Sequence, residues 1–402
     1  MHYRRILSGA ATQILSSIAN LVFNLALARQ VSPESYGIFA IGFASMLLAA
    51  GLAQAAFLTP MTFHTAGKSK AYNRTIQRRT LRLLTAISGL TLPAVIAAGF
   101  VLWSNSEQRN IFAIFCLIGF ANIFREFFVR CLLDRKSFVA STLANLSFLG
   151  VMATLEISLL MLGSTDLVDH LTAYLIALAA AAVTASSFAR INPFALPKKS
   201  DARLLCFLLR SGKWSCITTI AFNIRTQAPN LFAFGFIGLT GIAQLNSHRI
   251  LVSPLLLIIP AITPTLLRTL AESHRNSTDN QEVRTGKLAV IAMAIGTTYT
   301  CALAIIYPTL LHHIFPKYKS DWFILTGWGI YGTTVFVRSI LDVSIQAKGR
   351  FRSASLASTG ISAISIPIAI LLSWAFAERG ALLSIIVAEL MLLITLAQVS
   401  RK

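Results

Sequence analysis

The chain has 402 residues, of which 55% are hydrophobic and 12% are charged, and its formal net charge is +20. Soluble domains carry about 25% charged residues, so this composition excludes an ordinary soluble enzyme or binding module. The charged residues lie in short clusters between apolar runs of about 20 residues, the length that crosses a bilayer as a helix. The sequence therefore predicts an all-α integral membrane protein.

Taken in chain order, the apolar runs predict twelve membrane-spanning helices. Their expected limits are 6–28, 36–60, 81–103, 110–132, 138–162, 171–191, 213–235, 241–267, 288–310, 322–346, 353–376 and 380–399. We expect an N-terminal six-helix bundle at 1–191, a cytoplasmic linker at 192–212 and a C-terminal six-helix bundle at 213–402. Apolar residues in the linker recur at helical spacing between Arg203 and Arg210, which predicts an amphipathic helix at the membrane surface.

Basic residues are distributed unevenly between the two sides of the predicted bundle. With the N-terminus in the cytoplasm, 25 of the 35 Lys and Arg residues fall in cytoplasmic segments, 5 on the opposite side and 5 within spans. Such a bias is typical of membrane proteins and predicts that both termini are cytoplasmic. The charge then marks topology and contact with membrane lipid. Because no nucleic-acid-binding motif accompanies it, we expect no nucleic-acid partner.

The two halves share a weak internal similarity. Gly37-Ile38 of the second span matches Gly241-Ile242 of the eighth, 204 residues later, and Arg125 of the fourth span matches Arg338 of the tenth, 213 residues later. An even number of spans in each half implies parallel repeats related by a pseudo-twofold axis along the membrane normal. Substrate sites in such folds lie between the repeats.

Polar side chains form a stripe on the first span and another on the seventh. The stripes are Thr12, Ser16, Asn20 and Asn24 in the first span, and Thr219, Asn223, Gln227 and Asn230 in the seventh. Residues at this spacing share one helix face. Hydrogen bonding between helices is one explanation, and the lining of a cavity is the other. The matching positions favour a cavity, in which Asn20, Asn24, Asn223 and Gln227 would contact substrate.

When residues at the span ends are counted with the adjoining loops, five arginines and no lysine lie within the spans. Glu126 and Arg130 are four residues apart, acid first, which favours a pair along one helix. Arg338 has Asp342 four residues later, whereas Arg125, Arg225 and Arg249 have no acid one turn away.

The three arginines without a local acid leave two interpretations open. One is an ion pair between helices, for which Glu156 and Glu389 are available. The other is a cationic cavity for an anionic ligand, because guanidinium binds diphosphate or carboxylate oxygens in bidentate fashion. On this second interpretation Arg125, Arg225, Arg249 and Arg338 would bind substrate.

Carboxylates within the spans could also carry a coupling ion. The candidates are Glu126, Glu156, Asp342 and Glu389, and a structural ion pair is the alternative for each. An enzyme would instead need a cluster of catalytic acids at a membrane face. Asp166 and Asp169 are the close acidic pair in an outward loop, where a solvated loop is the simpler explanation. Neither a zinc-protease motif nor a phosphate-binding glycine loop is present, so we expect no enzymatic activity, metal or cofactor.

Three segments together resemble the polysaccharide and O-antigen flippases of the multidrug/oligosaccharidyl-lipid/polysaccharide exporter superfamily. They are LARQVSPESYGIFAIGFASMLLAAGLAQA, with Ser32, Pro33, Tyr36 and Gly37 as matching elements, NIRTQAPNLFAFGFIGLTGIAQLNSHRIL and VRSILDVSIQAKGRFR. The resemblance implies two six-helix bundles around a central cavity that opens alternately to each side. It also implies transport of undecaprenyl-diphosphate-linked oligosaccharide to the periplasmic leaflet of the bacterial inner membrane, for surface or exopolysaccharide synthesis.

The same resemblance implies contact with the polysaccharide polymerase and export machinery of such pathways. One departure concerns the related lipid II flippases, which have fourteen spans and basic residues within the first two. Because this sequence has twelve predicted spans and no basic residue inside the first two, lipid II is not the expected substrate. A cation-coupled multidrug exporter of the same superfamily is the alternative, although such a site would need unpaired carboxylates.

Overall fold

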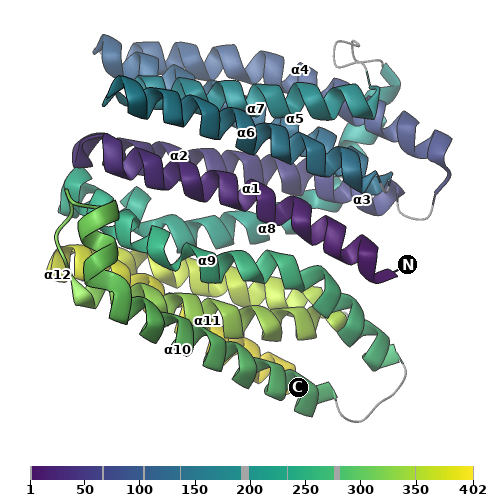
Figure 1. The fold of residues 1–402 in the computed structure, drawn as a ribbon. Helices are drawn as coiled ribbons and strands as arrows, with labels where there is room; N and C mark the ends of the chain where they lie inside the picture. Colours follow the sequence, from purple (N-terminus) through teal and green to yellow (C-terminus); the bar gives the residue numbers. More distant parts are fainter. Residues whose placement is uncertain are drawn as a thin grey trace. The chain divides into compact units, whose positions relative to one another are not determined.

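Regular structure is entirely helical in the part of the chain that the computed structural model describes (Figure 1). The described residues are 2–65, 68–102, 105–135, 137–191, 199–232, 234–275, 281–348 and 350–401. The helices of the first half are α1 (His2–Gln30), α2 (Pro33–Ala53), the short π-helix η1 (Gln54–Leu58), α3 (Thr59–Thr65), α4 (Lys70–Leu102), α5 (Ser106–Asp134), α6 (Phe138–Leu162) and α7 (Leu167–Ala189).

The second half contains fewer and longer helices. They are α8 (Lys199–Phe232), α9 (Phe234–Arg275), α10 (Gln281–Ile314), α11 (Trp322–Ala347) and α12 (Phe351–Arg401). Two of them are bent where one residue leaves the helical conformation, namely Gly238 in α9 and Ala377 in α12. The bend at Ala377 separates the two spans that the sequence predicts at 353–376 and 380–399.

Short polar side chains begin several of these helices. Asn105, Asp166 and Asp321 each accept a hydrogen bond from a backbone N–H of the following first turn. These bonds satisfy donors that have no partner inside the helix. Asp166 caps α7, and Asp169 accepts from Ser164 Oγ at 2.6 Å. Both of these acids therefore have structural roles.

Eight of the described helices are long and apolar enough to cross a membrane, and one of these, Arg352–Ser400, contains two predicted spans. The predicted spans outside this set belong to α1, α8 and α11. In α8 and α11, polar and charged side chains, among them Arg225 and Arg338, lower the hydropathy. Large apolar side chains such as Val101, Met161 and Ile305 are exposed on the helices of the set, as expected where a helix faces lipid.

The chain forms two compact units. Unit 1 comprises Met1–Phe23 and Gly42–Ile220, and unit 2 comprises Asn24–Ile41 and Ala221–Lys402. The predicted division at 192–212 is simpler than this one, because α1, α2 and α8 each contribute to both units. Residues 192–198 of the predicted linker lie outside the described residues. Its remainder is the first part of α8, which continues without interruption into the seventh predicted span.

Each unit has its own apolar core. In unit 1, α5 packs against α7 and α4, and α6 packs against α7, around side chains such as Phe127, Leu132 and Leu81 (Figure 1). In unit 2, α11 packs against α9, α10 and α12, with Leu255 and Ile340 among the buried contacts. These cores fix the helices from which the buried charged side chains project.

Candidate functional site

Arg125 on α5 is buried within unit 1, with 3% of its surface exposed. Its Nη1 donates to Ser16 Oγ at 3.0 Å and to Asn145 Oδ1 at 3.2 Å, and its Nη2 donates to Glu126 Oε1. Its guanidinium also lies 4.9 Å from the centre of the Phe148 ring, a cation–π contact. The prediction that Arg125 lacks a partner is therefore wrong. Neighbouring residues point about 100° apart on a helix, but the long arginine side chain bends back to its neighbour.

The predicted pair between Glu126 and Arg130 is also wrong. Glu126 contacts Arg125, whereas Arg130 Nε donates to Thr62 Oγ1 of α3 at 3.1 Å. The buried guanidinium takes the acid because an uncompensated charge costs more inside the protein than near its surface. Arg130 lies closer to the end of α5, where Asp134, one turn later, is the nearby acid.

The polar stripe of α1 forms hydrogen bonds to other helices of unit 1. Asn20 Oδ1 accepts from Tyr174 Oη at 2.9 Å, and Tyr174 stacks on Phe23 with 4.4 Å between ring centres. Ser16, one turn earlier, accepts from Arg125. Interhelical hydrogen bonding thus explains these members of the stripe. Asn24 belongs to unit 2, where it is half-buried and has a partner of its own.

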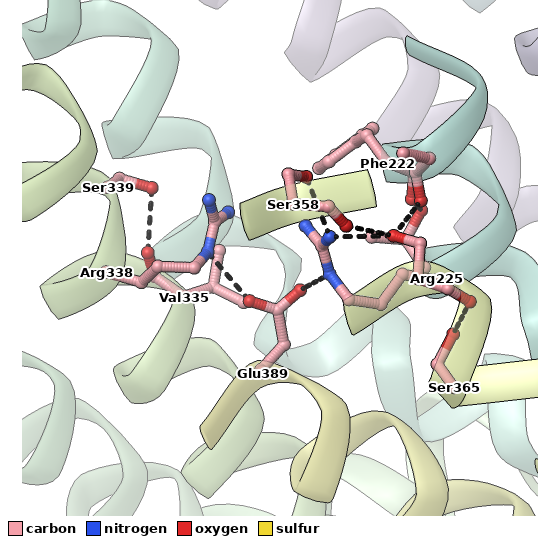
Figure 2. A network of polar contacts seen from close by, with 11 residues as sticks. Phe222, Arg225, Val335, Arg338, Ser339, Ser358, Ser365 and Glu389 are labelled. Atoms are coloured by element: carbon pink, nitrogen blue, oxygen red, sulfur yellow. Dashed lines mark hydrogen bonds and ion pairs between the residues drawn. The ribbon is translucent and has the colours of Figure 1, made fainter. Parts of the chain in front are cut away.

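Arg225 and Glu389 form a buried ion pair between α8 and α12 of unit 2 (Figure 2). Arg225 Nε donates to Glu389 Oε1 at 2.7 Å, and Arg225 Nη1 donates to Ser358 Oγ and Ser362 Oγ, each at 3.2 Å. Arg225 is 1% exposed and Glu389 is 0% exposed. Of the two explanations for Arg225, the structure supports an ion pair between helices.

Arg338 on α11 uses the same carboxylate (Figure 2). Its Nε lies 2.7 Å from Glu389 Oε2. The acid next to Arg338 is therefore not Asp342, four residues later on the same helix, as the sequence predicts, but one from α12. One carboxylate between two guanidiniums leaves an excess of one positive charge. We call Arg225, Arg338 and Glu389 the Glu389 cluster.

Arg249 on α9 has a different environment. It is half-buried, its Nη1 lies 3.5 Å from Gln227 Oε1, and its guanidinium lies 5.7 Å from the centre of the Trp328 ring. Among the described residues, no carboxylate forms an ion pair with Arg249. Of the two interpretations for Arg249, the described part of the chain therefore shows no ion pair between helices.

Buried amides extend the surroundings of Arg249. Asn230 Nδ2 donates to Gln227 Oε1 at 3.0 Å, and Asn246 Nδ2 donates to Asn230 Oδ1 at 2.8 Å. We call Arg249, Gln227, Asn230, Asn246 and Trp328 the Arg249 cluster. Asn223, one turn before Gln227 on α8, is buried and has a partner.

Asn246 and Trp328 were not predicted from the sequence. A signal for Asn246 exists, because Asn246 to Arg249 form a polar run inside an otherwise apolar span. No comparable signal points to Trp328, which belongs to another helix, α11. Its ring nitrogen donates to Leu245 O at 2.9 Å, which fixes the indole beside Arg249.

Glu156 pairs with His170 in unit 1, not with an arginine. His170 Nδ1 lies 2.9 Å from Glu156 Oε2, and both side chains are buried. His170 was not among the predicted site residues, although it lies directly before the sixth predicted span. The pair connects the end of α6 to the start of α7.

Comparison with known proteins supports the fold. No protein-family profile and no curated protein sequence matches the chain. Its structure is similar to that of an inward-facing multidrug resistance MATE family transporter of the MOP superfamily, with a TM-score of 0.77, 14% identity and coverage of 96% of this chain and 94% of that one. The outward-facing conformation of such a transporter matches with a TM-score of 0.67, 14% identity and coverage of 99% and 94%.

A MOP superfamily transporter from Pyrococcus furiosus is also similar, with a TM-score of 0.67, 13% identity and coverage of 99% and 94%. These matches cover nearly the whole chain. The predicted fold class is therefore confirmed: the chain has the all-helical, two-bundle membrane fold of MATE transporters. It is a multi-pass membrane protein, and the solved structures that it resembles are transporters.

Proposed function

We propose that this chain is a transporter of an anionic, lipid-linked oligosaccharide, and that it moves undecaprenyl-diphosphate-linked units from the cytoplasmic to the periplasmic leaflet by alternating access. The fold supports transport, because the similar structures are those of transporters. The resemblance of three segments to polysaccharide flippases supports this substrate class. The bias of basic residues supports an inner-membrane location with cytoplasmic termini.

The Arg249 cluster is the observation that carries the choice of an anionic substrate. A guanidinium without a carboxylate is costly inside a membrane protein unless a ligand or water compensates its charge. Arg249 lies over the face of Trp328 and beside Gln227, so its orientation is restricted before any ligand binds. A diphosphate could bind its remaining N–H groups, since arginine forms parallel hydrogen bonds to phosphate oxygens.

Substrate contact has less structural support for two other candidate arginines, because their nitrogens already have partners within the protein. Arg225 uses its Nε and Nη1 on Glu389, Ser358 and Ser362, so we assign it to holding α8 against α12. Arg125 is bound by Ser16, Asn145 and Glu126.

Arg338 contacts Glu389 through its Nε and shares this carboxylate with Arg225, so its charge is only partly compensated. It is the second residue that we propose for substrate binding, after Arg249. The asparagines Asn20, Asn24 and Asn223 are proposed only as secondary polar contacts.

An export assay tests this assignment. Arg249→Ala and Arg249→Lys should be compared with the wild type at equal membrane levels, with the exposed Arg29→Ala as the matched control. We expect Arg249→Ala to reduce polymer export at least about tenfold, because a hydrogen-bonded charge contributes about 1.5–3 kcal/mol. Arg249→Lys should retain part of the activity, since lysine keeps the charge but not the bidentate geometry. Full export by both Arg249 variants would remove Arg249 from the mechanism.

A cation-coupled multidrug exporter is the second candidate, and its support is that similar structures belong to multidrug resistance transporters. Against it stands the excess of arginine in the described spans, which repels cationic drugs. In the Pyrococcus furiosus transporter, a reversed polarity of the binding pocket suggests a different function, so this fold accommodates pockets of unlike charge. Efflux of a cationic dye that depends on this chain would favour the exporter.

A further inference from the structure

The first turns of α4 carry a row of like charges. Lys70, Arg74, Arg78 and Arg82 follow one another at four-residue spacing, which places them on one face of the helix. Like charges at this spacing destabilise a helix, and cations near the positive N-terminal end of the helix dipole add to the cost. Lys70, Arg74 and Arg78 are exposed, and none forms an ion pair with a described residue.

The length of α4 indicates the depth of this row. The helix has 33 residues, whereas about 20 residues cross the hydrocarbon layer. The apolar part begins near residue 83, so the preceding three turns extend beyond the hydrocarbon by about 18 Å at 1.5 Å per residue. Arg82 and Arg78 therefore lie at the level of lipid headgroups, and Arg74 lies one helical turn farther out.

A further guanidinium, that of Arg135, is fixed next to this row. Arg135, which follows α5, donates from Nε and Nη2 to Gln77 Oε1 at 3.0 and 2.7 Å, and from Nη1 to the backbone oxygen of Ala189 at the end of α7. Burial lowers the pKa of Arg135, and the nearby charges of Arg74 and Arg78 lower it further, while Cys131 and Asp134 act in the opposite direction. Arg74, Arg78 and Arg135, which we call the basic cluster, thus converge despite their mutual repulsion.

The acid beside the basic cluster, Asp134, is close to both Arg130 and Arg135. Its single negative charge therefore only partly compensates the guanidiniums around it. Aromatic side chains lie near the start of the same helix: Tyr72 Oη of α4 lies 2.7 Å from His64 Nε2, and Phe207 of α8 packs on His64 with 4.6 Å between ring centres. Aromatic side chains beside basic ones are typical of the membrane–water interface.

From this arrangement we propose that the basic cluster binds the phosphate of an anionic phospholipid headgroup. Arg74 and Arg78 contact the phosphate from the exposed face of α4, and Arg135, whose nitrogens already donate to Gln77 and Ala189, adds its positive charge nearby. The bound headgroup offsets the repulsion within the row. The site lies in unit 1 and is separate from the Arg249 cluster, so it does not depend on the proposed substrate.

Lipid binding to the purified full chain tests the proposal. Phosphatidylglycerol and phosphatidylcholine would each be titrated in detergent and bound lipid counted by native mass spectrometry, for the wild type and for Arg74→Gln/Arg78→Gln. The matched control is Arg29→Gln/Lys319→Gln, which removes two exposed charges elsewhere. Each basic residue near an anionic surface contributes about a fivefold change in affinity. We therefore expect the double variant to bind phosphatidylglycerol about 25-fold more weakly, with phosphatidylcholine binding and the control unchanged.

Two results would overturn the proposal. One is equal affinity of the wild type and the double variant for phosphatidylglycerol. The other is complete displacement of phosphatidylglycerol by millimolar inorganic phosphate, which would make the cluster a site for a free anion. Circular dichroism of the double variant shows whether it keeps its helices, so a folding defect is recognised separately. Neither result concerns polymer export, so either result would overturn the lipid-binding proposal without contradicting the proposed function.

Discussion

The Glu389 cluster and the Arg249 cluster lie in the same unit, but their arginines differ in burial and in whether a carboxylate contacts them. In the first, a buried carboxylate contacts two guanidiniums, and Arg225 is almost completely enclosed. In the second, a half-buried guanidinium has an aromatic face and amides around it but no described carboxylate. Full burial of an arginine requires an internal counter-ion. A partly exposed arginine can instead be paired with the anionic group of a ligand. Burial and the presence of a carboxylate thus distinguish a structural arginine from one that could bind substrate.

The largest expected effect comes from removing the shared carboxylate. Glu389→Gln leaves Arg225 and Arg338 buried without a negative charge, and losing one partner of a buried pair costs about 3–5 kcal/mol. We expect a large fall in the thermal unfolding temperature of the purified protein. The exposed Glu34→Gln is the control and should unfold like the wild type. Wild-type stability of Glu389→Gln would show that the cluster does not hold the helices together.

A smaller loss is expected when one arginine of the cluster is replaced. In Arg225→Met, Glu389 keeps Arg338 as its partner, so charge remains balanced and the cost is that of lost hydrogen bonds, about 1–2 kcal/mol. Arg249→Met should lower the unfolding temperature less than Arg225→Met does, because among the described residues no carboxylate would lose its partner when Arg249 is replaced. A greater loss of stability in Arg249→Met than in Arg225→Met would reverse the roles that we assign to the two residues.

Replacing the aromatic ring of Trp328 beside Arg249 is expected to have a modest effect on substrate affinity. Trp328→Phe and Trp328→Leu both lose the hydrogen bond to Leu245, but only the leucine variant loses the ring. A cation–π contact contributes about 0.5–1 kcal/mol at a partly exposed site, so Trp328→Leu should bind substrate about two- to fivefold more weakly than Trp328→Phe. Equal affinities of the two variants would mean that the ring does not orient Arg249.

The smallest effect on stability is expected when Glu126 of unit 1 is replaced. Glu126 has 40% of its side chain exposed whereas Arg125 is buried. Water screens the charge of Glu126, so this pair contributes less than the fully buried pair of Arg225 and Glu389. In Glu126→Gln, Arg125 keeps Ser16, Asn145 and Phe148 as partners. Stability should change by less than about 1 kcal/mol and export should be unaffected. A strong export defect at wild-type stability would instead give Glu126 a role in coupling.

The sequence predicts the fold class because apolar runs and their lengths report on single helices. Twelve spans can be recognised this way, as can the arginines inside them. Partners on other helices cannot, and so the pairing of Arg338 with Glu389 in place of Asp342 was missed. Which acid pairs with Arg338 depends on how α11 and α12 pack, and residue spacing within one helix does not predict that packing.

Local spacing also gave the wrong partner for Glu126. The four-residue rule favours Arg130, but it compares positions on an isolated helix and does not include burial. Inside the packed unit, Arg125 is the more deeply buried arginine and takes the acid. For Arg249 the sequence leaves two interpretations open. Among the described residues no carboxylate pairs with it, since few acids lie in the spans and Glu389 already contacts two arginines.

Direct binding of an undecaprenyl-diphosphate-linked oligosaccharide to the purified protein tests the central claim, that Arg249 holds the anionic group of the substrate. The dissociation constants of the wild type, Arg249→Ala and Arg225→Met would be compared under one detergent and salt condition. We expect Arg249→Ala to bind at least about tenfold more weakly, since hydrogen bonds to a charged group contribute about 1.5–3 kcal/mol, while Arg225→Met stays near the wild type. Wild-type affinity in Arg249→Ala would contradict the account.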